Sequence, residues 1–234
     1  MVTSPQYKNA SNPLQTFKDK VKILPNAINE KNFILQQGDE VEIENIKEKY
    51  SNKKIVFFVG RHIQYKGLPY LVEAERFIKS DCEIIIAGDG PLTDKLKSAC
   101  HSSRVHFVGR LDDNELRWHH YAASIFAFPS ITKNEAFGVA LAEAMYCGTP
   151  AVTFTIPGSG VNWVSLNNIT GLEVSNKDCK AYAGAIDKLL IDDRLREQFA
   201  RKSMERVKEH FTIPIMIHLL DSYYKNMFEN IYSK

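Results

Sequence analysis

The feature that most constrains this chain is a series of short, unbroken apolar runs, each ended by glycine or proline. "KKIVFFVG", "CEIIIAG" and "SIFAFPS" lack the alternation of a strand with one solvated face, so they predict strands buried on both faces. Segments with helical spacing separate them, among them "LPYLVEAERFI" and "GVALAEAMYCG". Repeated strand–helix units favour a parallel sheet covered by helices. We therefore predict an α/β fold, a single Rossmann-like doubly wound parallel sheet over Lys53–Glu173 with helices on both faces, plus C-terminal helices.

The sequence on either side of this core predicts less regular structure. "KVKILPN" favours a short strand ended by Pro25, and the acidic, lysine-rich stretch Glu30–Asn52 favours a linker. A helical pattern resumes after a break at Pro214 and carries an apolar stripe of Ile217, Leu220, Tyr224, Phe228 and Ile231. The expected units are an arm or remnant of a preceding domain over 1–20, a Rossmann-like nucleotide-sugar-binding domain over 21–211, and a crossover helix over 212–234.

Composition excludes several classes of protein. The 234 residues are 44% hydrophobic and 25% charged, with a net charge of +2, which is typical of a soluble globular protein and predicts no nucleic-acid partner. Four widely spaced cysteines favour a reduced, cytoplasmic chain, and no spacing predicts a metal site. His119 and His120 are adjacent rather than four residues apart. The longest apolar run, Ile213–Leu220, is too short to span a bilayer.

Ligands of open parallel sheets bind at the carboxyl ends of the strands, so the loops there are the candidate site. The first, "GRHIQYKG", contains Arg61 and Lys66, which favour a phosphate-bearing ligand; the alternative is an exposed basic loop. His62 lies beside Arg61 and either contacts phosphate or makes a structural hydrogen bond. "GDGP", "GRLD", "PSITKNEAFG" and "TIPGSGVN" follow the later strands. None of them has the GxGxxG or GxxxxGK[ST] spacing of a dinucleotide or P-loop site.

Two glutamates lie in the otherwise small and apolar segment "NEAFGVALAEAMYCGTP", and carboxylates are costly to bury without partners. We expect Gly138 to open a helix, so that Glu135 lies in the loop before it and Glu143 lies one and a half turns in. Free N–H groups around Phe137, Gly138 and Val139 would then form an anion pocket. The carboxylates could accept hydrogen bonds from ribose and hexose hydroxyls. The alternative is an N-terminal charge and a surface position.

Six motifs agree in order and spacing with a known family: "FFVGR…YKG", "IAGDGPL", "VHFVGRL", "FAFPS", "EAFGVALAEAMYCGTPAV" and "TGLEV". Over roughly Lys20 to Phe211 the chain resembles the carboxyl-terminal, donor-binding domain of group-1 (family 4) retaining glycosyltransferases of GT-B fold. The opening segments "VTSPQYKNA" and "KVKILPNAI" resemble the final helix and the interdomain crossover of the preceding domain.

The resemblance implies a role for each matched position. Arg61 and Lys66 would bind the donor diphosphate and Glu135 the transferred sugar, and these three are the expected catalytic residues. Glu143 would bind the ribose, and no metal or other cofactor is expected. The remaining donor-binding positions are Gly60, Gly88, Gly90, Arg110, Leu111, Ala136, Phe137, Gly138 and Val139. Ala136 departs from the glycine usual in the family, and "PGSGVNWV" lacks the usual glutamate.

The implied reaction moves a hexose from a nucleotide-diphosphate sugar, GDP-mannose or a UDP-sugar, to a glycan or lipid-linked acceptor in surface polysaccharide biosynthesis such as capsule or O-antigen. The full enzyme would be cytoplasmic; the alternative location is the inner face of the plasma membrane, where it would associate as a peripheral protein. An amino-terminal Rossmann domain is the missing partner, so we expect this chain alone to bind nucleotide but transfer sugar slowly or not at all. The alternatives are a non-catalytic nucleotide-sugar-binding module and a GT-B-type epimerase.

Overall fold

Six parallel strands form the centre of the computed structural model, which describes residues 1–232. The strand order is β3-β2-β1-β4-β5-β6, and every pairing is parallel. This confirms the predicted doubly wound sheet. The strands are β1 (Lys54–Val59), β2 (Cys82–Ala87), β3 (Val105–Gly109), β4 (Ile125–Phe128), β5 (Ala151–Phe154) and β6 (Gly171–Val174).

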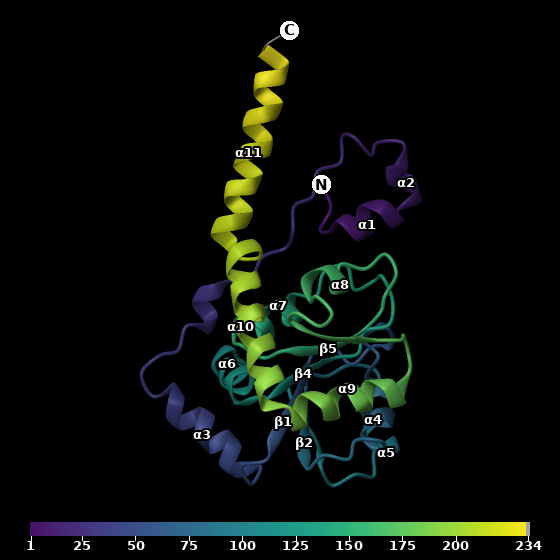
Figure 1. Ribbon diagram of the computed structural model, residues 1–234, viewed down its shortest axis with the longest axis vertical. Helices are drawn as coiled ribbons and strands as arrows, with labels where there is room; N and C mark the ends of the chain where they lie inside the picture. Colours follow the sequence, from purple (N-terminus) through teal and green to yellow (C-terminus); the bar gives the residue numbers. More distant parts are fainter. Residues whose placement is uncertain (233–234) are drawn as a thin grey trace.

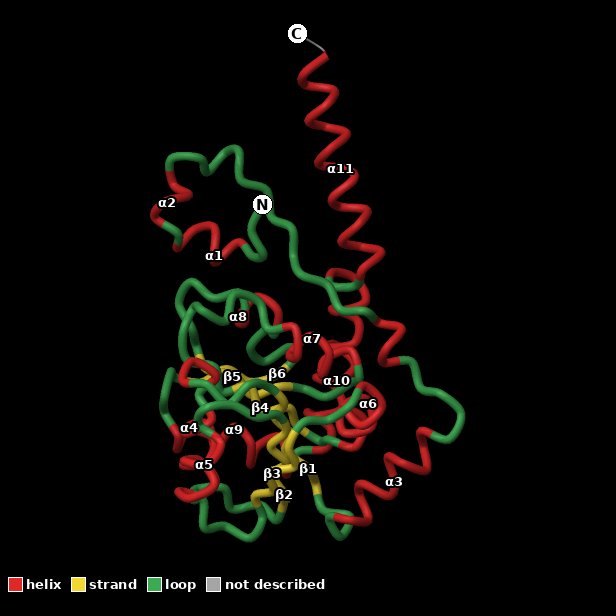
Figure 2. Tube along the Cα trace, turned by 180° about the vertical axis from the view of Figure 1, so that it is seen from behind, coloured by secondary structure: helices red, strands yellow, loops and turns green. Residues whose placement is uncertain are grey.

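Helices cover both faces of the sheet, as Figures 1 and 2 show from opposite sides. One face carries α4 (Leu68–Glu75), α5 (Thr93–Ala99) and α9 (Cys179–Ile191). The other carries α6 (Asp113–Ala122), α7 (Val139–Tyr146) and α10 (Asp193–His210). The short helix α8 (Val161–Val164) follows β5. Burial on both faces explains why the strands are apolar along their whole length.

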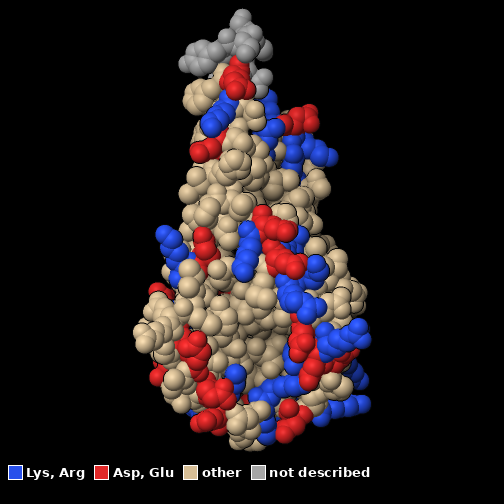
Figure 3. Space-filling view, turned by 60° about the vertical axis from the view of Figure 1, so that its left-hand side comes forward, with Lys and Arg blue, Asp and Glu red and all other residues tan. Residues whose placement is uncertain are grey.

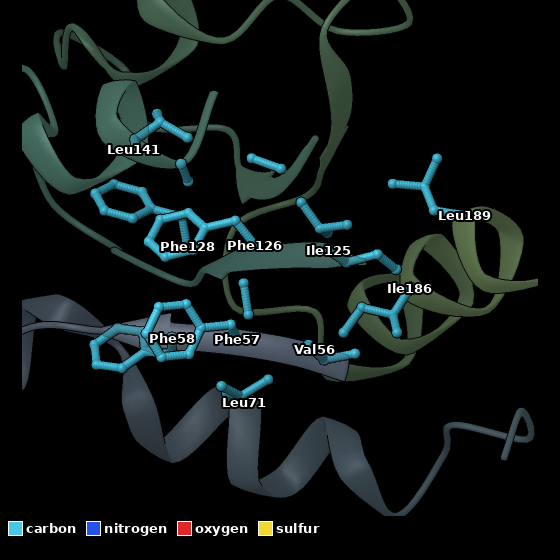
Figure 4. Packing of buried hydrophobic residues seen from close by; sticks show 14 of the residues in the cluster. Val56, Phe57, Phe58, Leu71, Ile125, Phe126, Phe128, Leu141, Ile186 and Leu189 are labelled. Carbon is cyan, nitrogen blue, oxygen red and sulfur yellow. The ribbon is translucent and has the colours of Figure 1, made fainter. Parts of the chain in front are cut away.

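The core is centred on β1 and β4, which pair with Val56 opposite Ile125 and Phe57 opposite Phe126. Figure 4 shows side chains of these two strands stacked between Leu71 of α4 and Leu141 of α7. All of these side chains are fully buried. Each contributes roughly 1.5–3 kcal/mol through removal from water, so this strand pair is firmly fixed.

The prediction of a linker over Glu30–Asn52 is wrong. This stretch contains a 3₁₀ helix, η1 (Glu30–Phe33), and an α-helix, α3 (Asp39–Lys49), which packs on α6. The charged surface of this stretch gave no sign that Asp39 anchors it to the rest of the fold. The Asp39 carboxylate accepts hydrogen bonds from Arg117 at 2.8 and 3.1 Å and from the Trp118 indole at 2.6 Å. The Arg117 guanidinium holds the pKa of Asp39 well below its usual range.

The first 25 residues form an arm with two short helices, α1 (Pro5–Ala10) and α2 (Asn12–Gln15). The predicted strand in "KVKILPN" is wrong, because this segment makes only an isolated bridge between Ile23 and Val2. Pro25 lacks the N–H that would continue a ladder. A few residues later the Ile28 N–H donates instead to the Phe211 carbonyl, which ties the segment to the end of α10.

The last helix, α11 (Ile213–Tyr232), projects away from the sheet in Figure 1, and it begins next to Pro214 as predicted. Its apolar stripe is partly exposed, with Ile217 at 49%, Tyr224 at 47% and Phe228 at 52%. The side chain of Ile231 and residues 233–234, which belong to the predicted crossover helix, lie outside what the structure describes. The Tyr223 hydroxyl donates to the Ile23 carbonyl at 2.8 Å, so α11 contacts the returning arm.

Within residues 1–232, no helix combines the length and apolar character needed to cross a bilayer. Lysine, arginine, aspartate and glutamate side chains are intermingled on the face drawn in Figure 3. That mixture agrees with the net charge of +2. It differs from the single-sign stripe that nucleic-acid-binding surfaces present.

The buried ion pair of α3 and α6 leads to a stability prediction. Arg117→Ala leaves the Asp39 charge without its main partner, and both residues are at most 4% exposed. We expect the free energy of unfolding to fall by about 3 kcal/mol, measured by urea denaturation near neutral pH. The control Lys47→Ala breaks only the exposed pair with Glu44 on α3 and should cost about 0.5 kcal/mol or less. Equal losses in the two variants would contradict the prediction.

Candidate functional site

The order of the strands places the candidate site. Chain connections run from β1 outward through β2 and β3, then return to β4 on the other side of β1. At this switch point the loops after β1 and β4 lie next to each other. Lys66 comes from the first loop and Glu135 from the second, and their Nζ and Oε2 atoms are 2.5 Å apart. The structure therefore joins two of the predicted catalytic residues directly.

Glu135 is held from several sides. Its side chain is about one-tenth exposed, and the fully buried Ser130 hydroxyl donates to the same Oε2 atom at 3.1 Å. The Ser159 hydroxyl donates to the Glu135 carbonyl and accepts from the Val161 N–H at 3.2 Å. These bonds fix both the carboxylate and the backbone. Ser159 thus positions the loop.

The loops after β1, β2 and β3 enclose a hollow of about 570 Å³. A side chain at Gly88 is excluded, because an added Cβ would lie 2.1 Å from the Gly60 carbonyl oxygen, and Gly88 also has φ +103°. The two loops can therefore approach only with glycine there. The hollow is lined by Val59, Gly60, Arg61, Gly88, Asp89, Gly90, Arg110 and Leu111, which include six of the predicted site residues.

The hollow contains two arginines in different states. Arg61 is exposed, and its guanidinium donates no hydrogen bond to any of residues 1–232. Arg110 instead pairs with Asp89 at 2.8 and 3.1 Å, which lowers the pKa of Asp89. Arg61 is thus the cation free to meet an anion. Lys66 is close by, because a Cβ added to Gly60 would lie 3.9 Å from Lys66 Cε.

Backbone donors gather before α7. Gly138 is the N-cap of this eight-residue helix, as predicted, with φ +90°. The N–H groups of Ala136, Phe137, Gly138 and Val139 donate to no other group among the described residues. Such a row at the positive end of a helix favours an anion or a hydroxyl oxygen. Only the backbone of Phe137 is available, since its ring packs edge-on against Phe211 in the core.

Glu143 lies on α7 and is partly buried. Burial, together with the nearby charge of Asp113, raises the pKa of Glu143 to about 7. No described residue donates a hydrogen bond to its carboxylate. Asp113 follows directly on the loop of Arg110 and Leu111, so the charge that acts on Glu143 lies next to that loop. Glu143 is not among the residues that line the hollow.

Two site residues were missed by the sequence reasoning. Asp89 lies between the two glycines of "GDGP", and its pairing with Arg110 has no signal in the sequence. Ser130 lies in "FPS" and looked like the end of a strand. A hydroxyl five residues before Glu135 could have been considered, but nothing in the spacing showed that it would point at the carboxylate.

His62, His120 and Trp163 make structural contacts. His62 is buried, with both ring nitrogens bonded. His120 is fully buried among aromatic rings, which lowers its pKa to about 3. Trp163 packs on Phe211 with ring centroids 5.2 Å apart, which favours packing over sugar stacking. Residues 1–232 contain no cluster of three or more His, Cys, Asp or Glu side chains arranged for a metal ion.

Together, the doubly wound sheet and the loops at its switch point define a Rossmann-like domain with a candidate ligand site at that edge of the sheet. The family model "Glycosyl transferases group 1" matches residues 39–206. The chain belongs to this family, which confirms the resemblance inferred from the motifs.

Individual relatives support the assignment to this family. O-antigen chain mannosyltransferase C of Escherichia coli is 26% identical over 95% of this chain and 58% of its own length. Sucrose-phosphate synthase from Thermosynechococcus elongatus superposes with a TM-score of 0.81 at 26% identity, over 98% of this chain and 58% of its own. Anabaena HepE, solved with UDP-glucose, has a TM-score of 0.76 at 19% identity, over 89% and 58%. The chain spans little more than half the length of the curated relatives it matches.

The environment of Glu143 leads to a pH prediction. A raised pKa in the folded state means that stability is fully present below the unfolded-state pKa of 4.5 and is lost as the pH rises through about 7. Glu143→Gln removes this loss. The measured quantity is the free energy of unfolding of the variant minus that of the wild type, from denaturant titrations. We expect this difference to be about 2–3 kcal/mol larger at about pH 8 than at about pH 5.

The matched control for this prediction is Glu197→Gln, which neutralises an exposed glutamate on α10. Its unfolding curve should follow the wild type at both pH values. A difference between Glu143→Gln and the wild type that stays constant across the pH range would contradict the assignment.

Proposed function

We propose that this chain is the donor-binding part of a retaining hexosyltransferase that uses a nucleotide-diphosphate sugar. The observation that carries the proposal is the Lys66–Glu135 ion pair at the switch point, together with the Arg61 guanidinium, which has no hydrogen-bond partner among residues 1–232. One cation is thus already close to a carboxylate suited to sugar hydroxyls, and another is free for phosphate. Retention of anomeric configuration rests on the family resemblance.

In the proposed reaction, Arg61 and Lys66 bind the diphosphate. The bond between the sugar carbon and the diphosphate oxygen breaks, an acceptor hydroxyl oxygen bonds to that carbon in its place, and the hydroxyl proton leaves with the nucleoside diphosphate. Negative charge develops on the leaving nucleotide as the first bond breaks. These two cations stabilise that charge electrostatically. We propose that they do so without a metal ion. Lys66 is shielded, with its side chain 14% exposed, so its charge is little screened by water.

The sugar and the ribose have separate carboxylates in this proposal. Glu135, oriented by Ser130, accepts hydrogen bonds from hydroxyls of the transferred sugar, aided by the free N–H groups of Ala136, Phe137 and Gly138. Glu143 accepts from the ribose hydroxyls. Donors of this kind would favour its charged form, and they would therefore lower the pKa that burial has raised.

Two relatives support the two candidate donors. The Escherichia coli relative is an O-antigen chain mannosyltransferase, which favours mannose as the sugar and therefore GDP-mannose as one donor. The UDP-glucose bound in the HepE structure favours a UDP-sugar as the other. The acceptor would be a glycan or lipid-linked glycan of surface polysaccharide biosynthesis. A lipid-linked acceptor would bring the full enzyme to the inner face of the plasma membrane, where it would bind as a peripheral protein.

Calorimetric titration of the chain with UDP, GDP and ADP tests the proposal. We expect one nucleotide to bind. Its affinity should fall at least tenfold in Arg61→Ala and in Glu143→Ala, because each variant loses a charge-assisted contact. The control Arg201→Ala removes an exposed arginine on α10 and should bind as the wild type does. A folded chain that binds none of the three, or variants that bind normally, would overturn the proposed site.

A further inference from the structure

His62 follows Arg61 in the loop after β1, yet only 1% of it is exposed. Its ring lies between the aromatic rings of Phe58 and Phe107, with centroids 6.4 and 6.3 Å away. Its Nδ1 is 2.8 Å from the Thr93 hydroxyl, and its Nε2 is 3.4 Å from the Ala87 carbonyl oxygen. The ring therefore contacts the chain, and the ligand-facing position is left to Arg61.

One arrangement of protons satisfies all of these contacts. The Gly90 N–H donates to the Thr93 hydroxyl oxygen at 3.0 Å, which leaves the hydroxyl hydrogen for His62 Nδ1. The Nε2 atom must then carry the proton, because it faces the carbonyl oxygen of Ala87, which can only accept. The result is a neutral imidazole in a relay from Gly90 through Thr93 and His62 to Ala87. Burial lowers the pKa of His62 and so favours this neutral form.

The backbone follows the same path. The His62 N–H donates to the Asp89 carbonyl at 2.7 Å, and the Leu92 N–H donates to the His62 carbonyl at 3.0 Å. A Cβ added to Gly90 would lie 2.7 Å from the His62 carbonyl oxygen, so the two loops are in direct contact. Side-chain and backbone bonds thus join the loop that carries Arg61 to the loop that carries Asp89.

We propose that His62 and Thr93 are positioning residues for the nucleoside diphosphate: their relay holds the loop after β1 against the loop after β2, and so fixes the backbone at Arg61 on the wall of the hollow before the ligand binds. The inference rests on the proposed function, because that function supplies the ligand. Fixing a phosphate-binding cation in advance reduces the ordering cost of binding. Neither residue touches the ligand in this arrangement.

Three threonine variants separate positioning from general stability. Thr93→Val keeps the shape but removes the hydroxyl, and we expect the affinity for the preferred nucleotide among UDP, GDP and ADP to fall about tenfold in calorimetry. Thr93→Ser restores the hydroxyl and should return the affinity to within about twofold of the wild type. Thr149→Val is the matched control, since its buried hydroxyl donates to the His120 carbonyl at 2.7 Å, in a different part of the fold.

Thr149→Val should lower the thermal unfolding midpoint about as much as Thr93→Val does, but should leave nucleotide affinity unchanged. Nitrogen-15 NMR of the histidine rings tests the relay without any ligand. We expect His62 to be neutral with its proton on Nε2, and we expect the Nδ1 resonance to shift in Thr93→Val and not in Thr149→Val.

Four outcomes overturn the inference. A His62 ring with its proton on Nδ1 would break the relay. Nucleotide affinity that is unchanged in Thr93→Val, or equally reduced in Thr149→Val, would remove the positioning role while leaving the proposed function intact. A wild-type chain that binds none of the three nucleotides would overturn the proposed function, and the positioning role with it.

Discussion

The hydrogen-bonded pairing of β1 with β4 is the contact on which the site depends. It sets Phe57 opposite Phe126, and it is the point where the strand order reverses. Because parallel strands end at the same edge, the loops that follow these two strands must meet there. Lys66 and Glu135 are separated by 69 residues in the chain, yet their charged atoms are 2.5 Å apart for this reason. The buried aromatic core of the two strands therefore also fixes the relative position of Lys66 and Glu135 in the loops that follow.

Much of the fold could be predicted because its signals are local. Continuous apolar runs such as "KIVFFV" reveal strands buried on both faces, and Gly138 marks the start of α7. The failures have a physical cause as well. Helix α3 has a strongly charged surface, and only Asp39 and Ile43 within it are buried, so no apolar stripe identified it. Its anchor is the distant Arg117, and single-sequence patterns do not show a contact between residues so far apart.

The candidate site also has features that the sequence predicts and features that it does not. Residue type and loop position were enough to select Arg61, Lys66 and both glutamates, because cations and carboxylates at strand ends are unusual enough to be noticed. The hydrogen-bond partners of these side chains could not be predicted from the sequence. The sequence did not show that Arg110 would bind Asp89 while Arg61 would find no hydrogen-bond partner among the described residues. It also did not show that Ser130 would orient Glu135. These differences depend on side-chain directions that only the packed loops determine.

The two glutamates that the segment after β4 contains resolve the cost of burial in opposite ways. Glu135 has a cation and a hydroxyl from its own chain, so its charge is compensated before any ligand arrives. Glu143 has no donor among the described residues, and burial shifts its pKa to about 7 instead. A buried carboxylate that lacks a donor gains most from a ligand that brings one. The asymmetry therefore favours Glu143 as the residue whose hydrogen bonds are completed by bound hydroxyls, and Glu135 as a group already organised around Lys66.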